Sequence, residues 1–132
     1  MSSPAKFPDR PQKFDQLIAF YPVRDLVETS HFYGDTLGLE LVRDQGVCRI
    51  YRVGAEAYLG FCTHMHDEPL GSMIITLVTP EVDTWHSFLI SAGVPCSSPP
   101  TYNSRFGIYH GFYRDPNGYA VEIQQFDLPL EG

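Results

Sequence analysis

The sequence predicts an α+β fold in which two βαβββ modules form a cupped, eight-stranded mixed sheet with the helices on its outer face. Three observations support this prediction: two amphipathic helical segments, short strand-like segments around each of them, and an internal repeat that relates the two halves at an offset of 55 residues. Because the repeat occurs only twice, it indicates a duplicated supersecondary unit and argues against a solenoid.

Cap residues and apolar spacing define the two helices. Asp25 is suited to cap the first helix, and Gly38 is placed to end it. The second helix is expected to start at Thr79, with Pro80 at its first helical position, and to end at Gly93. Both segments carry apolar residues on one face at helical spacing, so each helix is expected to cover a sheet.

Eight strands are expected around these helices. They cover residues 16–22, 39–43, 47–53 and 57–63 in the first half, and 72–78, 94–97, 106–114 and 119–126 in the second. The Ser- and Pro-rich stretch 97–104 is expected to be a loop. We expect a flexible lead-in over residues 1–13 and a single domain over residues 14–132, with modules at about 14–66 and 71–127.

Composition and charge restrict the class of protein. The 132 residues are 43% hydrophobic and 19% charged, which is enough apolar material for a folded core. The formal net charge of −7 argues against nucleic acid as a partner. No apolar stretch approaches the ~20 residues needed to cross a bilayer, and the N-terminus lacks a secretory signal, so we expect no membrane association and a cytoplasmic location. Cys48, Cys62 and Cys96 form no CxxC pair and are expected to be reduced thiols.

Two motifs resemble those of a known family. The run from Val23 to Leu39 resembles the V-x-D…F-Y…L-G-L signature of the vicinal-oxygen-chelate superfamily, which contains glyoxalases, bleomycin-resistance proteins and extradiol dioxygenases. The run from Asp115 to Ile123 resembles its D-P-x-G-x-x-x-E signature. The resemblance covers roughly residues 14–126, and it implies the cupped fold more strongly than any reaction, because one fold supports many functions.

The resemblance also implies where a metal would bind. In the metal enzymes of that family, inward-facing residues on the first and last strand of each module supply the ligands. Carried over to this sequence, those positions fall on Ile18, Met73, Gly60 (or Tyr58 or Cys62, within two residues) and Glu122. Of the four principal positions, only Glu122 offers a good ligand for a divalent cation. We therefore expect no cofactor and no metal there, as in the bleomycin-resistance-type binding proteins.

Glu122 and His110 are the candidate catalytic residues. Glu122 would lie at the floor of the cup as a general base or hydrogen-bond acceptor. His110 lies on the neighbouring strand of the predicted hairpin and could shuttle a proton near neutral pH. The alternatives are a Glu122 retained only to pair with an arginine, and a structural His110.

A further set of side chains is expected to bind the ligand. Arg49 and Tyr51 alternate on the third strand and share a face, so both could contact an anionic or phenolic group if that face lines the cup. Cys48 and Ile50 would then face the other way, under the helices. The alternative is a solvated strand face. The other candidate substrate-binding residues are Tyr58, Ile18, Met73 and Tyr113, and Phe20 and Ile75 are further apolar positions expected to point inward.

A nonstandard metal site is the remaining hypothesis. Cys62, His64 and His66 would share one face of an extended segment, and thiolate and imidazole ligands suit zinc or copper. The alternative interpretation is an exposed polar loop.

These observations favour a glyoxalase/bleomycin-resistance-like protein that binds a small organic ligand in the cup without the usual metal. One alternative is an enzyme of the same superfamily, a lyase, isomerase or dioxygenase, with a nonstandard metal site or metal-free acid–base chemistry centred on Glu122. The second alternative is a non-catalytic interaction domain. The resemblance further implies a homodimer.

Overall fold

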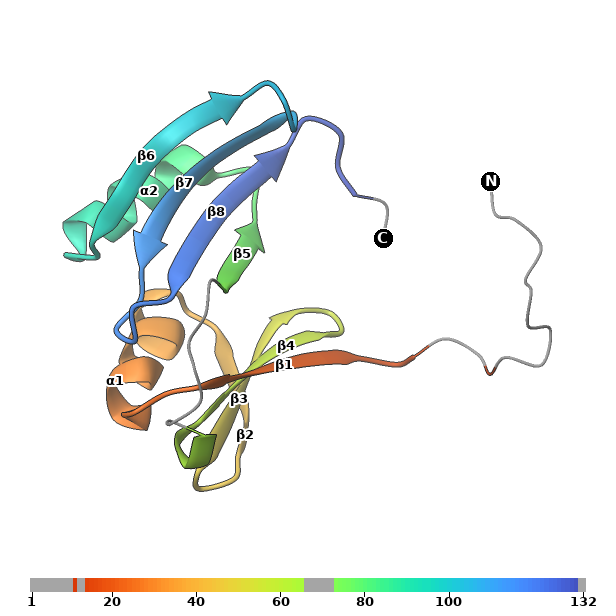
Figure 1. Cartoon of the computed structure of the whole chain (residues 1–132), viewed down its shortest axis with the longest axis vertical. Coiled ribbons are helices and arrows are strands. Elements are labelled where there is room, and N and C mark those ends of the chain that lie inside the picture. The colour runs from red at the N-terminus through yellow and green to blue at the C-terminus, as the bar shows by residue number, and fades with distance from the viewer. Residues whose placement is uncertain (1–10, 12–13, 66–72, 131–132) are drawn as a thin grey trace.

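The computed structural model describes residues 11, 14–65 and 73–130, and it contains two βαβββ modules (Figure 1). The elements of the first module are β1 (Leu17–Pro22), α1 (Leu26–Ser30), the π-helix η1 (His31–Thr36), β2 (Glu40–Asp44), β3 (Cys48–Gly54), β4 (Ala57–Cys62) and the 3₁₀ turn η2 (Thr63–Met65). Those of the second are β5 (Ile74–Val78), α2 (Val82–Ser91), β6 (Cys96–Asn103), β7 (Ile108–Arg114) and β8 (Ala120–Phe126). The predicted order of elements is confirmed.

The strands form two mixed four-stranded sheets, ordered β1-β4-β3-β2 and β5-β8-β7-β6. In each sheet the first and last strand of the module pair in parallel, and the other neighbours pair antiparallel. Each sheet has a helix on one side. We call this side the helix face and the opposite side the cup face, which carries Phe20 and Tyr58 in the first module and Glu122 in the second.

The helix faces of both sheets contribute to one hydrophobic core. Tyr33 of η1 stacks on Phe61 of β4, with ring centroids 4.3 Å apart. Leu89 of α2 and Tyr113 of β7 are fully buried in the same core. Because a shared apolar core is the main source of stability in a domain of this size, it fixes the two modules against each other.

The caps of the helices follow local chemistry. Asp25 caps α1 as predicted, since its carboxylate accepts from the backbone N–H groups of Val27 and Glu28 at 2.9 and 3.1 Å. The start of the second helix was predicted too early: Pro80 was expected at its first helical position, whereas α2 begins at Val82. The Thr79 hydroxyl accepts instead from the N–H of Glu81 at 3.1 Å and holds a turn that precedes the helix.

The first helix contains one more residue than the second. The N-caps Asp25 and Glu81 are 56 positions apart (81 − 25), whereas the positive-φ glycines that follow the helices, Gly38 and Gly93, are 55 apart (93 − 38). The π-helical turn of η1 accommodates the extra residue, because its backbone bonds run from residue i to i−5. The repeat offset therefore changes within the helix.

This change affects the alignment of the strands before the helices. β1 ends at Pro22 and β5 at Val78, which is an offset of 56 (78 − 22). Ile18 therefore corresponds to Ile74, and the predicted correspondence with Met73 is wrong by one residue. Because side chains alternate along a strand, one residue moves a side chain to the other face of the sheet.

The predicted loop 97–104 is also wrong. Most of it belongs to β6 (Cys96–Asn103), which pairs with β7 through two register shifts. β6 is the edge strand of its sheet. An edge strand with irregular pairing tolerates Pro99 and Pro100, because it has fewer ladder hydrogen bonds for them to disrupt.

Two of the three cysteines are not reduced thiols as expected. Cys48 of β3 and Cys62 of β4 lie directly opposite each other across the antiparallel pair and form a disulfide. Cys96 is the free cysteine among the described residues. The pairing follows from the register of β3 on β4. The spacing of the cysteines in the sequence does not reveal that register.

None of the helices in the described part of the chain is long and apolar enough to cross a bilayer. Of the predicted lead-in, residues 1–10 and 12–13 lie outside the described residues.

Candidate functional site

A buried carboxylate–imidazole pair lies on the cup face of the second module. Glu122 Oε2 on β8 is 2.6 Å from Nδ1 of His110 on β7, and Thr76 of β5 donates a hydrogen bond to Glu122 Oε1 at 2.8 Å. Only 10% of the Glu122 side chain and 12% of the His110 side chain is exposed. Three neighbouring strands therefore converge on one carboxylate.

The register of the second sheet explains this contact. Thr76 lies opposite Glu122 in the β5–β8 pair, and His110 lies opposite Gln124, which makes it the diagonal neighbour of Glu122. Diagonal residues on one sheet face are within reach of long side chains. The structure thus brings together both candidate catalytic residues, and Thr76 is a member of the site that sequence reasoning missed.

Apolar side chains border this polar pair. Phe112 lies opposite Glu122 in the β7–β8 pair, and its ring packs edge-on against the His110 imidazole with centroids 5.1 Å apart. Ile74 precedes Thr76 by two residues on β5 and is 49% exposed. With the proton on Nδ1, His110 donates to Glu122, and Nε2 is then an acceptor. A few convergent polar groups among apolar neighbours are typical of a site for a small organic molecule.

The cup face of the first module is hollowed. A depression of about 300 Å³ is lined by Gln16, Ile18, Val42, Arg43, Ile50, Arg52 and Tyr58. The Tyr58 hydroxyl accepts from Arg52 Nη1 at 2.9 Å and from Gln16 Nε2 at 3.2 Å. The oxygens of Tyr58 and Glu40 raise the pKa of the Arg52 guanidinium. The candidates Ile18 and Tyr58 therefore lie together, beside the guanidinium of Arg52.

Arg49 and Tyr51 face the helix and not the cup. Arg49 Nη1 donates to Ser30 Oγ at 2.6 Å, and the Tyr51 hydroxyl donates to the same oxygen at 2.7 Å. Tyr51 is buried, and its ring packs near Phe61 in the core. Alternation along β3 then puts Ile50 on the cup face, the reverse of the prediction. Ser30 of α1 was the available signal, because a polar side chain on the sheet-facing side of a helix needs a partner from the sheet.

The other two predicted lining residues are also on the helix face. Tyr113 is fully buried, its hydroxyl hydrogen-bonds with Nδ1 of His86 on α2 at 2.8 Å, and burial raises its pKa to about 12. Met73 packs against the hydrophobic core, as does Ile75, which is part of it. Tyr113 pairs with Val121 rather than Glu122, so strand alternation directs it away from the cup.

The positions that would hold the family's metal do not form a ligand set. Ile18 and its structural counterpart Ile74 carry hydrocarbon side chains. Gly60 has none, and the space where a Cβ would stand is filled by the ring of Phe20. Glu122 Oε1 already accepts a hydrogen bond from Thr76, and Oε2 is hydrogen-bonded to His110. One carboxylate does not match the three or four side-chain ligands of such a site.

A different group of metal-binding side chains lies at the end of β4. Of the predicted set, Cys62 and His64 lie close together, and His66 lies outside the described residues. The structure adds Cys48, so that one ligand atom each from Cys48, Cys62 and His64 falls within 4.8 Å of the others. His64 Nδ1 is 3.8 Å from Cys48 Sγ.

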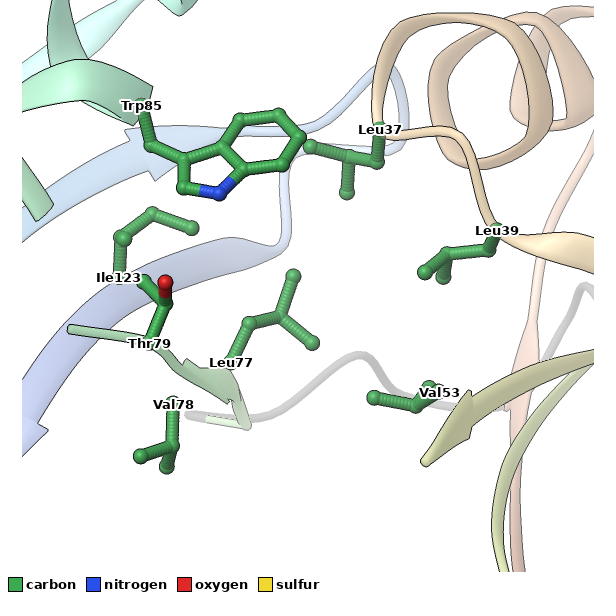
Figure 2. A pocket seen from close by; sticks show the side chains of 8 residues that line it. All are labelled: Leu37, Leu39, Val53, Leu77, Val78, Thr79, Trp85 and Ile123. Carbon is green, nitrogen blue, oxygen red and sulfur yellow. The ribbon is translucent and has the colours of Figure 1, made fainter. Parts of the chain in front are cut away.

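An apolar cavity of about 230 Å³ lies between the modules (Figure 2). It is lined by Leu37, Leu39, Val53, Leu77, Val78, Thr79, Trp85 and Ile123. Trp85 of α2 is half-buried at this cavity. Its described lining contains no titratable side chain, so the chemically distinctive groups are those of the cup face.

Comparison with known proteins agrees with this architecture. The sequence profile of the Glyoxalase/Bleomycin resistance protein/Dioxygenase superfamily matches residues 13–123. No curated protein sequence matches the chain significantly.

Several solved structures share the fold. TnmS3, an antibiotic binding protein from a Streptomyces species, is 26% identical, with a TM-score of 0.76 over 89% of this chain and 100% of that one. An integron cassette protein from the Halifax Harbour sewage metagenome is 20% identical, with a TM-score of 0.73 over 84% and 97% of the two chains. A lactoylglutathione lyase from Agrobacterium tumefaciens is 21% identical, with a TM-score of 0.68 over 87% and 94%. The last two likenesses establish the fold alone.

Proposed function

This chain belongs to the glyoxalase/bleomycin resistance protein/dioxygenase superfamily, and we propose that it binds a small, largely apolar organic ligand on the cup face at Glu122 and His110, without a metal at the family's usual positions. The ligand is aromatic and carries a hydroxyl or amine that donates a hydrogen bond.

The 2.6 Å contact between His110 Nδ1 and Glu122 Oε2 carries this proposal. A buried carboxylate that accepts a hydrogen bond from Nδ1–H fixes the orientation and tautomer of the imidazole, as carboxylates hydrogen-bonded to metal-binding histidines do in other proteins. Nε2 is then the acceptor for a donor group on the ligand. Phe112 and Ile74 supply apolar surface beside it for an aromatic ring.

The likeness to an antibiotic-binding protein supports a binding role. That protein and this chain are similar over nearly their whole lengths. Sequestration of a toxic compound needs a pocket and no chemistry, which is consistent with the hydrocarbon side chains of Ile18 and Ile74 at positions where the metal enzymes place ligands.

Calorimetric titration with a panel of bicyclic and tricyclic phenols and amines tests the proposal. Each phenol is paired with its O-methyl ether and each amine with its N,N-dimethyl counterpart, neither of which can donate the hydrogen bond. We expect at least one compound to bind more tightly than its methylated counterpart, and Glu122→Gln to weaken that binding by about tenfold, the effect of losing about 1.4 kcal/mol.

Glu28→Gln is the matched control, because Glu28 is an exposed carboxylate on α1, away from the cup face. It is expected to leave binding unchanged. If neither Glu122→Gln nor methylation of the ligand changes the affinity, the assignment of the site is wrong.

Proton transfer by the same pair is the second candidate function. The short contact joins two titratable groups, so His110 could take a proton from a bound ligand while Glu122 stabilises the imidazolium. Hydrogen–deuterium exchange at a C–H group of a ligand from the panel, followed by NMR, would reveal it. If the protein accelerates exchange and Glu122→Gln abolishes the acceleration, the protein is an enzyme. If exchange is no faster than in buffer, the binding role alone remains.

We also propose that the cup face binds a second copy of this chain. Phe20 (45% exposed) and Val78 (61%) leave apolar surface uncovered in both modules. A two-fold dimer would cover these residues isologously. Light scattering during size-exclusion chromatography is expected to give twice the chain mass, and Val78→Glu is expected to shift it toward the monomer. A wild-type monomer at tens of micromolar would contradict the dimer.

A further inference from the structure

We propose that Cys48, Cys62 and His64 form a redox-controlled zinc site, which is closed as a disulfide under oxidising conditions and binds Zn²⁺ after reduction. The site lies where β3 begins and β4 ends, away from the Glu122–His110 pair, and does not depend on the ligand proposed above.

The backbone already presents the two cysteines to a common point. Cys48 and Cys62 are cross-strand partners in the antiparallel β3–β4 pair, with Cα atoms 4.2 Å apart. Both are buried, on the cup-face side of the neighbouring strands β3 and β4. Two adjacent strands hold the Cα atoms in place, so breaking the disulfide frees the sulfurs to move by side-chain rotation alone.

His64 supplies the third ligand. It follows Cys62 by two residues in η2, and its Nδ1 is 3.8 Å from Cys48 Sγ. In a tetrahedral zinc site, bonds of about 2.3 Å to sulfur and about 2.0 Å to nitrogen place those two atoms roughly 3.5 Å apart. The nitrogen–sulfur distance in the structure is already close to that value.

A dithiol is the reductant that converts the disulfide form of the site to the zinc-binding form. Two electrons from the dithiol cleave the Cys48–Cys62 bond and give two thiols, while the dithiol closes to its own disulfide. Zinc then displaces the two thiol protons and bonds two thiolates and the neutral imidazole of His64. Oxidation reverses the sequence and releases Zn²⁺.

The ligand types favour zinc over harder cations. Two thiolates and an imidazole are the donors found in Cys/His zinc sites, whereas magnesium and calcium prefer oxygen. His64 is exposed, so the ion can enter from solvent, and a water molecule can take the fourth position.

Zinc titration of the full chain in both redox states tests the proposal. One sample is kept oxidised, and the other is reduced with a water-soluble phosphine, with competition against a chromophoric zinc chelator and elemental analysis after gel filtration. We expect about one zinc ion per reduced chain and a negligible amount per oxidised chain. Cobalt in place of zinc is expected to give thiolate-to-metal charge-transfer absorption in the reduced protein only.

Variants separate this site from adventitious binding. His64→Ala is expected to weaken zinc affinity at least tenfold, and Cys48→Ser with Cys62→Ser to abolish binding. The matched controls are His31→Ala, another exposed histidine, and Cys96→Ser, the remaining cysteine, and both are expected to bind zinc as the wild type does.

Three results would overturn the proposal. They are the absence of zinc binding by the reduced chain, equal binding by the oxidised chain, and equal effects of His64→Ala and His31→Ala. Circular dichroism of the reduced protein gives a fourth criterion, because loss of the native spectrum on reduction would show that the disulfide is a structural bond and not a reversible one.

Discussion

The hydroxyl of Tyr33 donates a 2.8 Å hydrogen bond to the carboxylate of Asp115, a residue 82 positions later in the chain. Both side chains are buried. Asp115 also accepts from the backbone N–H groups of Asn117 and Tyr119 at 2.8 Å, so its carboxylate organises the turn between β7 and β8. The contact therefore ties the π-helical turn of the first module to a hairpin turn of the second. Burial and the neighbouring carboxylate of Asp115 raise the pKa of Tyr33.

Tyr33→Phe is expected to lower the free energy of unfolding by about 1–3 kcal/mol, because it leaves a buried carboxylate without one of its donors. Urea denaturation followed by circular dichroism measures the change. Tyr102→Phe is the control: Tyr102 also donates to a carboxylate, that of Asp127, but at the surface, where the loss is expected to stay within about 0.5 kcal/mol. Equal losses in the two variants would contradict a special role for the Tyr33–Asp115 contact.

Gly60→Ala is expected to destabilise the protein by about 1–3 kcal/mol, because the new methyl group would overlap the ring of Phe20. Gly54→Ala is the matched control on the same hairpin, since a Cβ at that position meets open space. A double-mutant cycle with Phe20→Ala is expected to show a coupling of at least about 0.5 kcal/mol, because removal of the ring relieves the overlap. Additive effects would mean that the cost arises elsewhere.

Alkaline pH is expected to destabilise the protein through its buried tyrosines. Burial raises the pKa of Tyr113 and of Tyr119 to about 12, above the value of about 10 in the unfolded chain. Above pH 10 the unfolded chain releases these protons first, so the free energy of unfolding falls as the pH rises from about 10 to about 12. Denaturation across this range, with tyrosinate absorbance as a second signal, measures the slope. Tyr113→Phe should make it shallower, and an unchanged slope would exclude that residue as a contributor.

Glu122→Gln is expected to keep the fold while it changes the site. The amide has the same shape and can still bond to Thr76, but the charge-assisted bond to His110 becomes a neutral one. We expect a loss of unfolding free energy within about 2 kcal/mol and an unchanged near-ultraviolet circular dichroism spectrum. Global unfolding of this variant would assign Glu122 a structural role in place of a binding one.

Much of the fold could be predicted because its signals are local. Asp25 caps a helix through its own side chain, and Gly38 and Gly93 end helices through positive φ values that glycine adopts without strain. Each depends on a few neighbouring residues, so each is visible in the sequence. Glu122 and His110 could be singled out in the same way, from a motif and from a titratable residue on the adjoining strand.

The remaining features depended on tertiary structure. Alternation shows that Arg49 and Tyr51 share a face of β3, but the pattern is unchanged when the strand is turned over, so packing against Ser30 decided which face is buried. The register of β3 on β4 decided that Cys48 meets Cys62.

The sequence by itself determined the order of the helices and strands and most of their positions, because those depend on neighbouring residues. The extent of β6 was an exception. Only the tertiary structure decided which side chains line the cup. The π-helical turn of η1 shifts the internal repeat by one residue, and one residue exchanges the faces of a strand, so Ile74 took the place predicted for Met73. Such a shift depends on the packing of the whole core, and no short stretch of sequence determines that packing.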